Sequence, residues 1–273
     1  MTEPEALTRA AERIEADAVA SMTLAAPAAV AAGLQLHVVA DEGVVSVLAA
    51  AVDVLQFNRV VALGVDRPAT EAQLDRLIVA ARDRGVRRLI VHAAPNAAPT
   101  ELTTWLHDRG ARLHNRWVRH WRRTDGPPDA PTALRIAPID AGTAVAFGVV
   151  ITSSFGMPPA LVPWLAALAT RPGWHVLGAF DGDALVAGAT FYAQPPYAWL
   201  GLGSTLAEHR GRGAQSALIA ARLAAAARLG CEWAIVETAE ETADRPVASY
   251  RNMRRLGFEE PYRRPNYLVA LGE

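Results

Sequence analysis

The segment His209-Arg210-Gly211-Arg212-Gly213-Ala214-Gln215-Ser216 decides the fold, because it joins a strand pattern at 197–204 to an Ala-rich helix pattern at 214–229. Glycines at such a junction let several backbone N–H groups converge, and the helix N-terminus adds about half a positive charge. Arg210 and Arg212 can add charge-assisted hydrogen bonds. The segment therefore predicts a pyrophosphate-binding loop; the alternative is an ordinary basic turn.

The patterns on both sides of this segment alternate in a mixed order. Asp181-Gly182-Asp183 supplies hairpin-turn chemistry between two apolar runs, which predicts an antiparallel strand pair. We therefore expect an α/β (α+β) fold with a mixed, largely antiparallel central sheet and flanking helices. The expected strands are 174–180, 184–192, 197–204, 232–237 and a pair over 258–269 broken at Pro265, and the expected helices are 214–229 and 247–256.

One break in these patterns divides the chain. The stretch Thr124-Asp125-Gly126-Pro127-Pro128-Asp129-Ala130-Pro131 contains adjacent prolines, which neither a helix nor a central strand accepts. We therefore expect a first lobe at 1–123, a linker at 124–133 and a second lobe at 134–273.

Glycines that can end helices recur in the two lobes at similar spacing. Gly85 and Gly110 in the first lobe correspond to Gly230 and Gly257 in the second, and a strand pattern follows each helix. This recurrence predicts two superposable lobes. The alternative is that two α/β segments share such glycines by chance.

Two motifs give the second lobe a resemblance to a known family. Arg210 and Gly213 have the spacing of the phosphate-loop signature of the GNAT superfamily of acyl-CoA-dependent N-acetyltransferases, although Gln215 stands where that signature has Gly or Ala. Gly257-Phe258, at the end of a helix two elements later, is the second family feature. The resemblance covers about 134–269 and implies acetyl-CoA as cosubstrate, with no metal.

The resemblance also implies which residues contact acetyl-CoA. In this family the strand before the loop splays from its neighbour and offers backbone groups to the pantetheine arm, and two glycines in that strand suit close approach of a ligand. The residues expected to bind the cofactor are Leu202, Gly203, Ser204, Arg210, Gly211, Arg212, Gly213, Ala214, Gln215, Ser216 and Asn252.

Amine acylation requires a proton acceptor and often an acid for the departing thiolate. By resemblance, Glu237 is the catalytic base; the alternative is a solvated glutamate at a strand end. The family's usual tyrosine position is Met253 here, so Tyr250, nearly one helical turn earlier and on about the same face, is the substitute acid. The alternative is a packed tyrosine and a thiolate that leaves unaided. Cys231 is expected to be a core residue, which predicts direct transfer without an acyl-enzyme.

The acceptor is an amine of a small molecule or of a protein, which the sequence does not identify further. Phe155 and Trp164 fall in the region that borders the acceptor site in this family, and Glu237 would face the same site. Core packing is the alternative for both aromatic residues.

The first lobe lacks an equivalent phosphate loop. Val65-Asp66-Arg67-Pro68-Ala69 is short, contains a proline without an N–H and carries an acid where an anion would sit. We therefore expect a degenerate GNAT-like lobe that packs, dimerises or walls the substrate site, as in tandem members of the superfamily with one working lobe. One cofactor per chain follows, in a monomer or a homodimer.

Composition excludes other classes of protein. Hydrophobic residues make up 51% and charged residues 20% of the 273, which favours a folded chain over a disordered one. The net charge of −1 gives no field for a polyanion, so no nucleic acid is expected, although arginines and tryptophans at 116–123 suit single strands. One cysteine, seven histidines without ligand spacing and an acidic N-terminus predict a cytoplasmic protein without disulfide, metal or membrane span. A non-catalytic acyl-CoA sensor is the alternative function.

Overall fold

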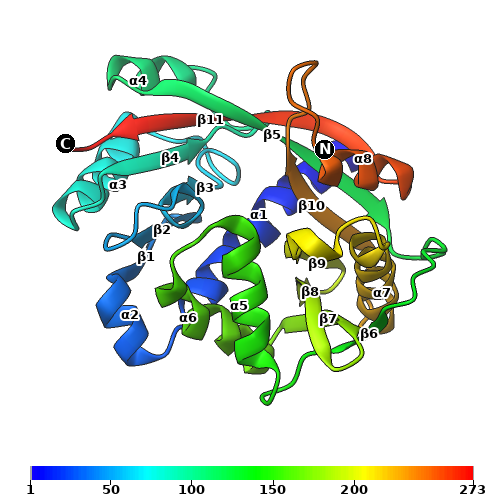
Figure 1. Ribbon diagram of the computed structural model, residues 1–273. Coiled ribbons are helices and arrows are strands. Elements are labelled where there is room, and N and C mark those ends of the chain that lie inside the picture. Colours follow the sequence, from blue (N-terminus) through cyan, green and yellow to red (C-terminus); the bar gives the residue numbers. More distant parts are fainter. Residues whose placement is uncertain (1, 273) are drawn as a thin grey trace. The chain divides into compact units, whose positions relative to one another are not determined.

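The computed structural model describes residues 2–272, which form two compact units (Figure 1). The first unit contains the chain up to Leu24, Ala28–Val118 and the chain from Tyr262 onward. The second unit contains Ala25–Pro27 and Arg119–Pro261. The boundary therefore lies within a strand at 118–119 and not in the expected linker at 124–133, and the last strand returns to the first unit.

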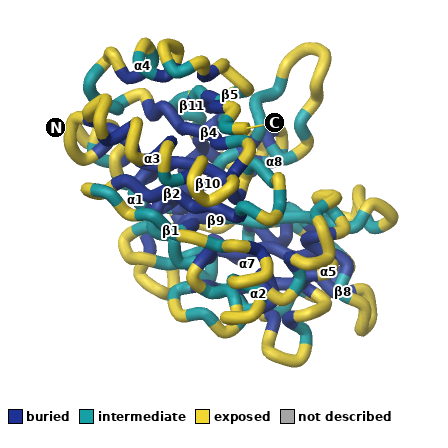
Figure 2. The backbone as a smooth tube through the Cα atoms, turned by 90° about the vertical axis from the view of Figure 1, so that its left-hand side faces the viewer, coloured by how far each residue is buried: buried dark blue, intermediate teal, exposed yellow. Residues whose placement is uncertain are grey.

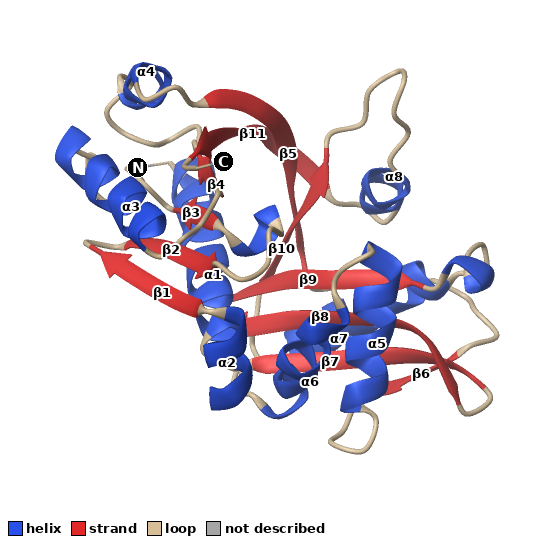
Figure 3. Cartoon of the chain, turned by 60° about the vertical axis from the view of Figure 1, so that its left-hand side comes forward, coloured by secondary structure: helices blue, strands red, loops and turns tan. Residues whose placement is uncertain are grey.

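The second unit is built on a mixed sheet, and Figure 3 shows β7, β8 and β9 side by side. The strand order is β5-β10-β9-β8-β7-β6, antiparallel from β6 to β9 and parallel between β9 and β10. Its strands are β5 (Arg112–Arg123, from Arg119 onward), β6 (Arg135–Pro138), β7 (Trp174–Asp181), β8 (Ala184–Gln194), β9 (Tyr197–Thr205) and β10 (Trp233–Ala239). Its helices are α5 (Ala144–Phe155), α6 (Val162–Ala166), α7 (Ala214–Arg228) and α8 (Ala248–Arg255).

Helices cover both faces of this sheet. A Cβ on Gly188 of β8 would meet the Phe147 side chain of α5, whereas a Cβ on Gly203 of β9 would approach Arg222 of α7. Gly188 is the cross-strand partner of Ser204, and successive residues of a strand point to opposite faces, so α5 and α7 lie on opposite faces. Their apolar stripes exclude water from the sheet between them (Figure 2).

The first unit has strand order β1-β2-β3-β4-β11, with β3 and β4 parallel and the other pairs antiparallel. Its core is formed by buried aliphatic residues that include Leu74, Leu77 and Leu89. The strands are β1 (Leu36–Asp41), β2 (Val44–Ala49), β3 (Arg59–Val61), β4 (Arg88–His92) and β11 (Glu259–Ala270, from Tyr262 onward), and the helices are α1 (Glu3–Thr23), α2 (Ala28–Leu34), α3 (Glu71–Asp83) and α4 (Leu102–Asp108).

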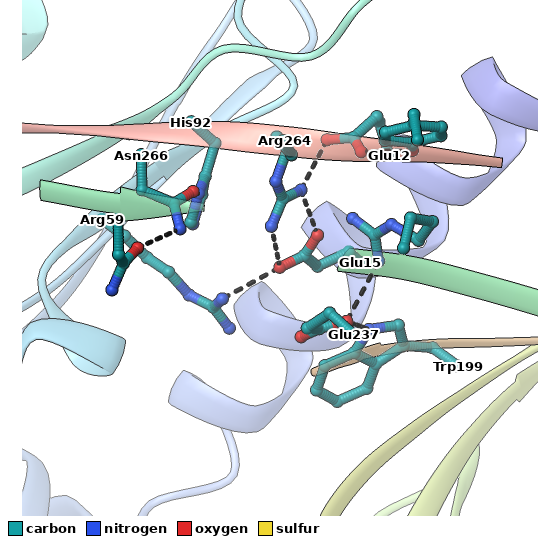
Figure 4. Close-up of polar contacts among 11 residues, drawn as sticks. Glu12, Glu15, Arg59, His92, Trp199, Glu237, Arg264 and Asn266 are labelled. Atoms are coloured by element: carbon teal, nitrogen blue, oxygen red, sulfur yellow. Dashed lines mark hydrogen bonds and ion pairs between the residues drawn. The ribbon is translucent and has the colours of Figure 1, made fainter. Parts of the chain in front are cut away.

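A buried ion cluster fixes α1 in this unit (Figure 4). Arg264 of β11 donates to Glu12 at 2.6 Å and also to Glu15, and Arg59 of β3 donates to Glu15 at 2.9 Å. All four side chains are at most 4% exposed. Removing one partner would leave a buried charge without compensation, at a cost of about 3–5 kcal/mol. The sequence patterns did not reveal this cluster, because its members are far apart in the chain.

The order of elements repeats along the chain, in line with the recurring glycines. A parallel strand pair is joined by a helix in each unit, β3-α3-β4 in the first and β9-α7-β10 in the second. A shorter helix and a long strand then follow, α4 and β5 in one case and α8 and β11 in the other.

Within residues 2–272, no single helix is long and apolar enough to cross a bilayer. Only α1 and α2 taken together approach that requirement, and they are bent by 105°.

Candidate functional site

The candidate site lies where β9 and β10 separate. Their parallel register pairs Tyr197 with Trp233 and Trp199 with Ile235, and it ends there. Nevertheless β9 continues to Thr205 and β10 to Ala239. Strands that diverge leave backbone N–H and C=O groups on their facing edges without ladder partners. The splayed strand that the family resemblance implied is therefore present.

A bulge in β9 adds to this opening. Gly201 pairs with Thr190 and Ser204 with Gly188, so that Leu202 and Gly203 together oppose the single residue Ala189. Leu202 has a φ of 48°, a left-handed conformation that is rare for a residue with a branched side chain. Bulges and such conformations redirect backbone groups out of the ladder, and they cluster at functional sites.

A cavity of about 690 Å³ occupies this region of the second unit. Its walls come from the ends of α5, β9 and β10, the loop before α7, the first turn of α7 and the segment that leads into α8. The lining residues are Ser154, Phe155, Gly203, Ser204, Thr205, His209, Arg210, Gly211, Gly213, Ala214, Gln215, Ser216, Ala239, Arg245, Pro246, Val247, Ala248, Ser249, Asn252 and Arg255.

One end of the cavity is suited to an anion. Gly213 is the N-cap of α7 with a φ of 82°, and no side chain caps the helix. The first N–H groups of α7 therefore lie at the cavity wall without an intrahelical partner. Arginines 210, 245 and 255 and the imidazole of His209 line the same cavity. A Cβ on Gly213 would lie 2.9 Å from the Pro131 carbonyl oxygen, so the backbone path requires glycine there.

Residues of α7 and α8 are linked at this end. The Asn252 amide donates to Gln215 Oε1 at 2.5 Å, and Arg255 donates to Ser216 Oγ at 2.6 Å and to Asn252 Oδ1 at 3.0 Å. Gln215, the residue that departs from the family signature, thus holds α8 beside the first turn of α7.

Two hydroxyl groups in the wall are ready for a ligand. Ser154 Oγ, at the end of α5, and Ser204 Oγ, on β9, are both buried, and within residues 2–272 neither has a hydrogen-bond partner. Both serines line the cavity. A buried hydroxyl without a partner is costly, so a polar ligand in the cavity would gain by bonding to either group.

Arg212 lies outside the cavity lining, unlike the rest of the expected loop. Its guanidinium donates to Asp181 at 2.5 Å, which holds the pKa of that carboxyl below its usual range, and it also contacts His209 Nδ1 at 3.0 Å. Its carbonyl oxygen accepts from Thr132 Oγ1 at 2.8 Å. Arg212 therefore ties the loop to the β7–β8 hairpin. Leu202 also lies outside the lining, next to Gly203 in the bulge.

Glu237 lies on β10, two residues beyond the last paired residue. Its Oε2 accepts from Arg119 Nη1 at 3.0 Å and from Trp199 Nε1 at 2.9 Å, and the side chain is 14% exposed (Figure 4). The residue is not in the cavity lining. Its carboxyl group is therefore held in place and mostly buried close to where the strands separate, and it is not a solvated strand-end side chain.

Tyr250 is directed away from the cavity. Its hydroxyl donates to Glu260 at 2.6 Å, which raises the pKa of the phenol, and its ring meets His120 edge-on. Tyr250 and Met253 do share one face of α8, as the spacing predicted, but that face is buried in the core. Ser249 and Asn252 occupy the face that lines the cavity.

Of the two aromatic candidates for the acceptor site, one lines the cavity and the other lies in the core. Phe155 is 50% exposed and lines the cavity beside Ser154. Trp164 is 1% exposed and belongs to the core, the alternative considered from the sequence. Cys231 is buried, as expected. Within residues 2–272, no group of three or more His, Cys, Asp or Glu side chains is arranged to hold a metal ion.

Several solved structures resemble this chain in fold. A GCN5-related N-acetyltransferase from Kribbella flavida is 19% identical, with a TM-score of 0.60 over 87% of this chain and 91% of that one. A putative acetyltransferase of the GNAT family from Novosphingobium aromaticivorans is 18% identical, with a TM-score of 0.54 over 90% and 97%. A tandem GNAT protein from the clavulanic acid biosynthesis pathway is also 18% identical, with a TM-score of 0.54 over 74% and 70%.

No family model matches the sequence, and no curated protein shows significant sequence similarity to it. Identities below 20% establish a shared fold and leave the activity open. The chain has the fold of the GNAT N-acetyltransferases, as the two sequence motifs predicted.

Proposed function

We propose that this protein is an N-acyltransferase that moves an acetyl group from acetyl-CoA directly to a primary amine. The observation that carries the proposal is the cavity at the separation of β9 and β10, which combines an uncapped helix N-terminus and four cationic or imidazole side chains with a backbone bulge. The GNAT fold supports acyl transfer in general. The proposal goes beyond the fold in naming acetyl-CoA as the donor and a primary amine as the acceptor.

The residues present fit coenzyme A. The pyrophosphate would bind the loop from Arg210 to Gly213 and the first N–H groups of α7, where charge and dipole favour an anion. The pantetheine arm carries amide groups, which match the edge groups of β9 that lack ladder partners and the hydroxyls of Ser154 and Ser204. When bound, acetyl-CoA supplies an activated acyl group.

Glu237 is the proposed proton acceptor. The two hydrogen bonds to its Oε2 hold the carboxyl group in one position on β10, and a general base must be held in position. Glu237 does not line the cavity, so transfer through a water to Glu237 fits better than direct capture. Tyr250, the other catalytic residue suggested by the sequence, receives no support from its placement, because its hydroxyl is engaged with Glu260.

One observation favours the second candidate function, a non-catalytic acyl-CoA sensor. Within residues 2–272 the cavity lining contains no tyrosine, cysteine or carboxylate, so binding groups outnumber groups that move protons. Turnover separates the two functions, because a sensor would bind acetyl-CoA and release no CoA when amines are added.

The test has two stages. Calorimetry with acetyl-CoA examines the cavity first, and a thiol-release assay across polyamines, aminoglycosides, amino acids and peptide N-termini then examines transfer. Binding followed by amine-dependent thiol release supports the acyltransferase. Binding without release from any amine supports the sensor, and absence of binding overturns both.

A further inference from the structure

Arg222, in the middle of α7, is a buried cation without an acidic partner. It is 2% exposed. Its Nη1 donates to the Thr190 carbonyl oxygen at 3.1 Å and its Nε to the Leu218 carbonyl oxygen at 3.2 Å. Within residues 2–272, these two backbone groups are its hydrogen-bond partners, and no carboxylate forms an ion pair with it.

The other buried arginines of the chain show how unusual this is. Arg59 and Arg264 contact Glu15, and Arg119 contacts Glu237. Burying a charge without a counterion is expensive, and a fold that keeps one there has a use for the positive potential. Burial lowers the pKa of Arg222 to about 9, so the side chain remains a cation at neutral pH.

Arg222 lies directly behind the bulge of β9. A Cβ built on Gly203 would be 3.7 Å from Arg222 Nη2, and Gly203 lines the cavity on its other side. The Thr190 residue that accepts from Arg222 also donates from its hydroxyl to the Gly201 carbonyl oxygen at 3.1 Å. The guanidinium is thus held close to the backbone of the bulge, beside a glycine that lines the cavity.

We infer that Arg222 is a positioning residue for acyl transfer, which supports the β9 bulge and stabilises the thiolate of coenzyme A as it departs. This inference rests on the proposed function. In the step concerned, the amine nitrogen bonds to the acyl carbon, and the carbon–sulfur bond breaks. Sulfur then leaves with the electron pair, and the amine loses a proton to Glu237 or to water. The negative charge on sulfur is the counterion that Arg222 lacks in the protein alone.

Arg222 thereby takes the role in thiolate departure that the sequence analysis expected of Tyr250. Backbone N–H groups at a bulge are neutral donors, whereas a buried guanidinium adds a full charge in a medium of low dielectric constant. It acts through the backbone without touching the substrate. A thiol bound beside the bulge should therefore ionise more readily than the same thiol in water.

The test measures ionisation of the thiol of free coenzyme A bound to the protein, followed by the ultraviolet absorbance of the thiolate across pH. Arg222→Met removes the charge at similar volume, Arg222→Lys keeps it, and Arg228→Met is the matched control, an exposed arginine on the same helix. In the parent, Arg222→Lys and Arg228→Met, we expect the bound thiol to ionise about tenfold more readily than in Arg222→Met.

Turnover gives the second measurement. We expect Arg222→Met to lower kcat about 10–100-fold while KM for acetyl-CoA changes less than threefold, with Arg222→Lys recovering most of the loss. If the Met variant does not fold, Arg222→Gln, which can still donate to Thr190, takes its place.

The outcomes are distinct. Equal thiol ionisation in the parent and the neutral variants overturns the role of Arg222, even if turnover falls. A parent that does not bind coenzyme A overturns the proposed function itself. A parent that binds and ionises the thiol, but acetylates no amine in the panel, leaves the Arg222 inference supported and refutes the acyltransferase.

Discussion

The two strand-to-helix loops of this protein have the same place in the element order, but the first leads into a capped helix and the second into an uncapped one. In the first unit, α3 begins with its own cap, because Thr70 Oγ1 accepts from the Gln73 N–H at 3.1 Å. In the second unit, α7 begins at Gly213 with no side-chain cap. Helix N-terminal N–H groups bind an external anion only if the chain itself has not satisfied them.

Backbone from elsewhere in the first unit also fills the space before α3. The Ala69 N–H donates to the Ala98 carbonyl oxygen at 2.7 Å, and the Ala98 N–H donates to the Gly64 carbonyl oxygen at 2.8 Å. A Cβ on Gly64 would lie 2.4 Å from that same Ala98 oxygen. Asp66 is paired with Arg13 at 3.4 Å. Element order alone therefore does not define a phosphate site. The site also requires that the N–H groups before and at the helix start are not already bonded within the protein.

The largest expected effect comes from a substitution that blocks the start of α7 in the second unit. Gly213→Asp brings a side chain against the Pro131 carbonyl oxygen, adds a negative charge beside the first N–H groups of α7, and does so at a backbone conformation that favours glycine. We expect acetyl-CoA affinity to fall more than about 100-fold by calorimetry, which is roughly 2.7 kcal/mol or more.

Gly230→Asp is the matched control for this substitution. Gly230 has nearly the same φ, 81° against 82°, and lies at the opposite end of α7 with nothing near its Cβ position. It shares the strain of a positive φ but not the contact with Pro131, and it should leave affinity unchanged. Unaltered affinity in folded Gly213→Asp would show that the loop is an ordinary basic turn.

The next effect concerns chemistry within the second unit. Glu237→Gln keeps the shape of the side chain and removes the proton acceptor, so we expect kcat to fall about 10²–10⁴-fold with acetyl-CoA affinity nearly intact. Steady-state kinetics with an amine identified in the panel provide the measurement.

Cys231→Ala is the companion variant and should retain activity, because the thiol is buried and burial raises its pKa. Parental turnover of Glu237→Gln between pH 6 and 9 would refute the base assignment. An acetyl group trapped on Cys231 would instead require a covalent mechanism.

A smaller effect tests the first unit. Thr70→Ala removes the cap of α3 and should cost about 1 kcal/mol of the free energy of unfolding, while acetyl-CoA affinity stays within twofold. Calorimetric titration of the parent and of this variant should both give a stoichiometry near one per chain. A value near two would show that the first unit also binds the cofactor, and that the Ala98 segment gives way to it.

The sequence predicted those parts of the molecule that local patterns determine. The helix expected at 214–229 is observed as Ala214–Arg228, and the strand expected at 174–180 as Trp174–Asp181. Thr70 caps α3 through the Gln73 N–H, three residues along the chain. These features depend on neighbours within a few residues.

Features that depend on distant residues were not predictable in the same way. The expected break at Pro265 does not occur, because β11 continues through it and the Pro265 carbonyl oxygen accepts from the Ala93 N–H. The fixed state of Glu237 depends on Arg119 and Trp199 from two other strands. Arg222 gave no signal at all, since an arginine in an Ala-rich helix has the pattern of a solvated charge.

The smallest expected effect separates the two faces of α8, the helix that follows the second parallel pair as α4 follows the first. Tyr250→Phe removes the hydroxyl that donates to Glu260 and leaves the ring against His120, so the core remains filled. We expect a loss of about 1 kcal/mol in unfolding free energy and a change in kcat of less than about threefold, measured by denaturant titration and by thiol release. Ser249→Ala, on the cavity face of the same helix, is the control: any effect it has should appear in KM for acetyl-CoA, with stability unchanged. A fall of 100-fold or more in kcat for Tyr250→Phe would restore the tyrosine as the acid for the thiolate. That result would also mean that the Tyr250 hydroxyl leaves Glu260 when the cofactor binds.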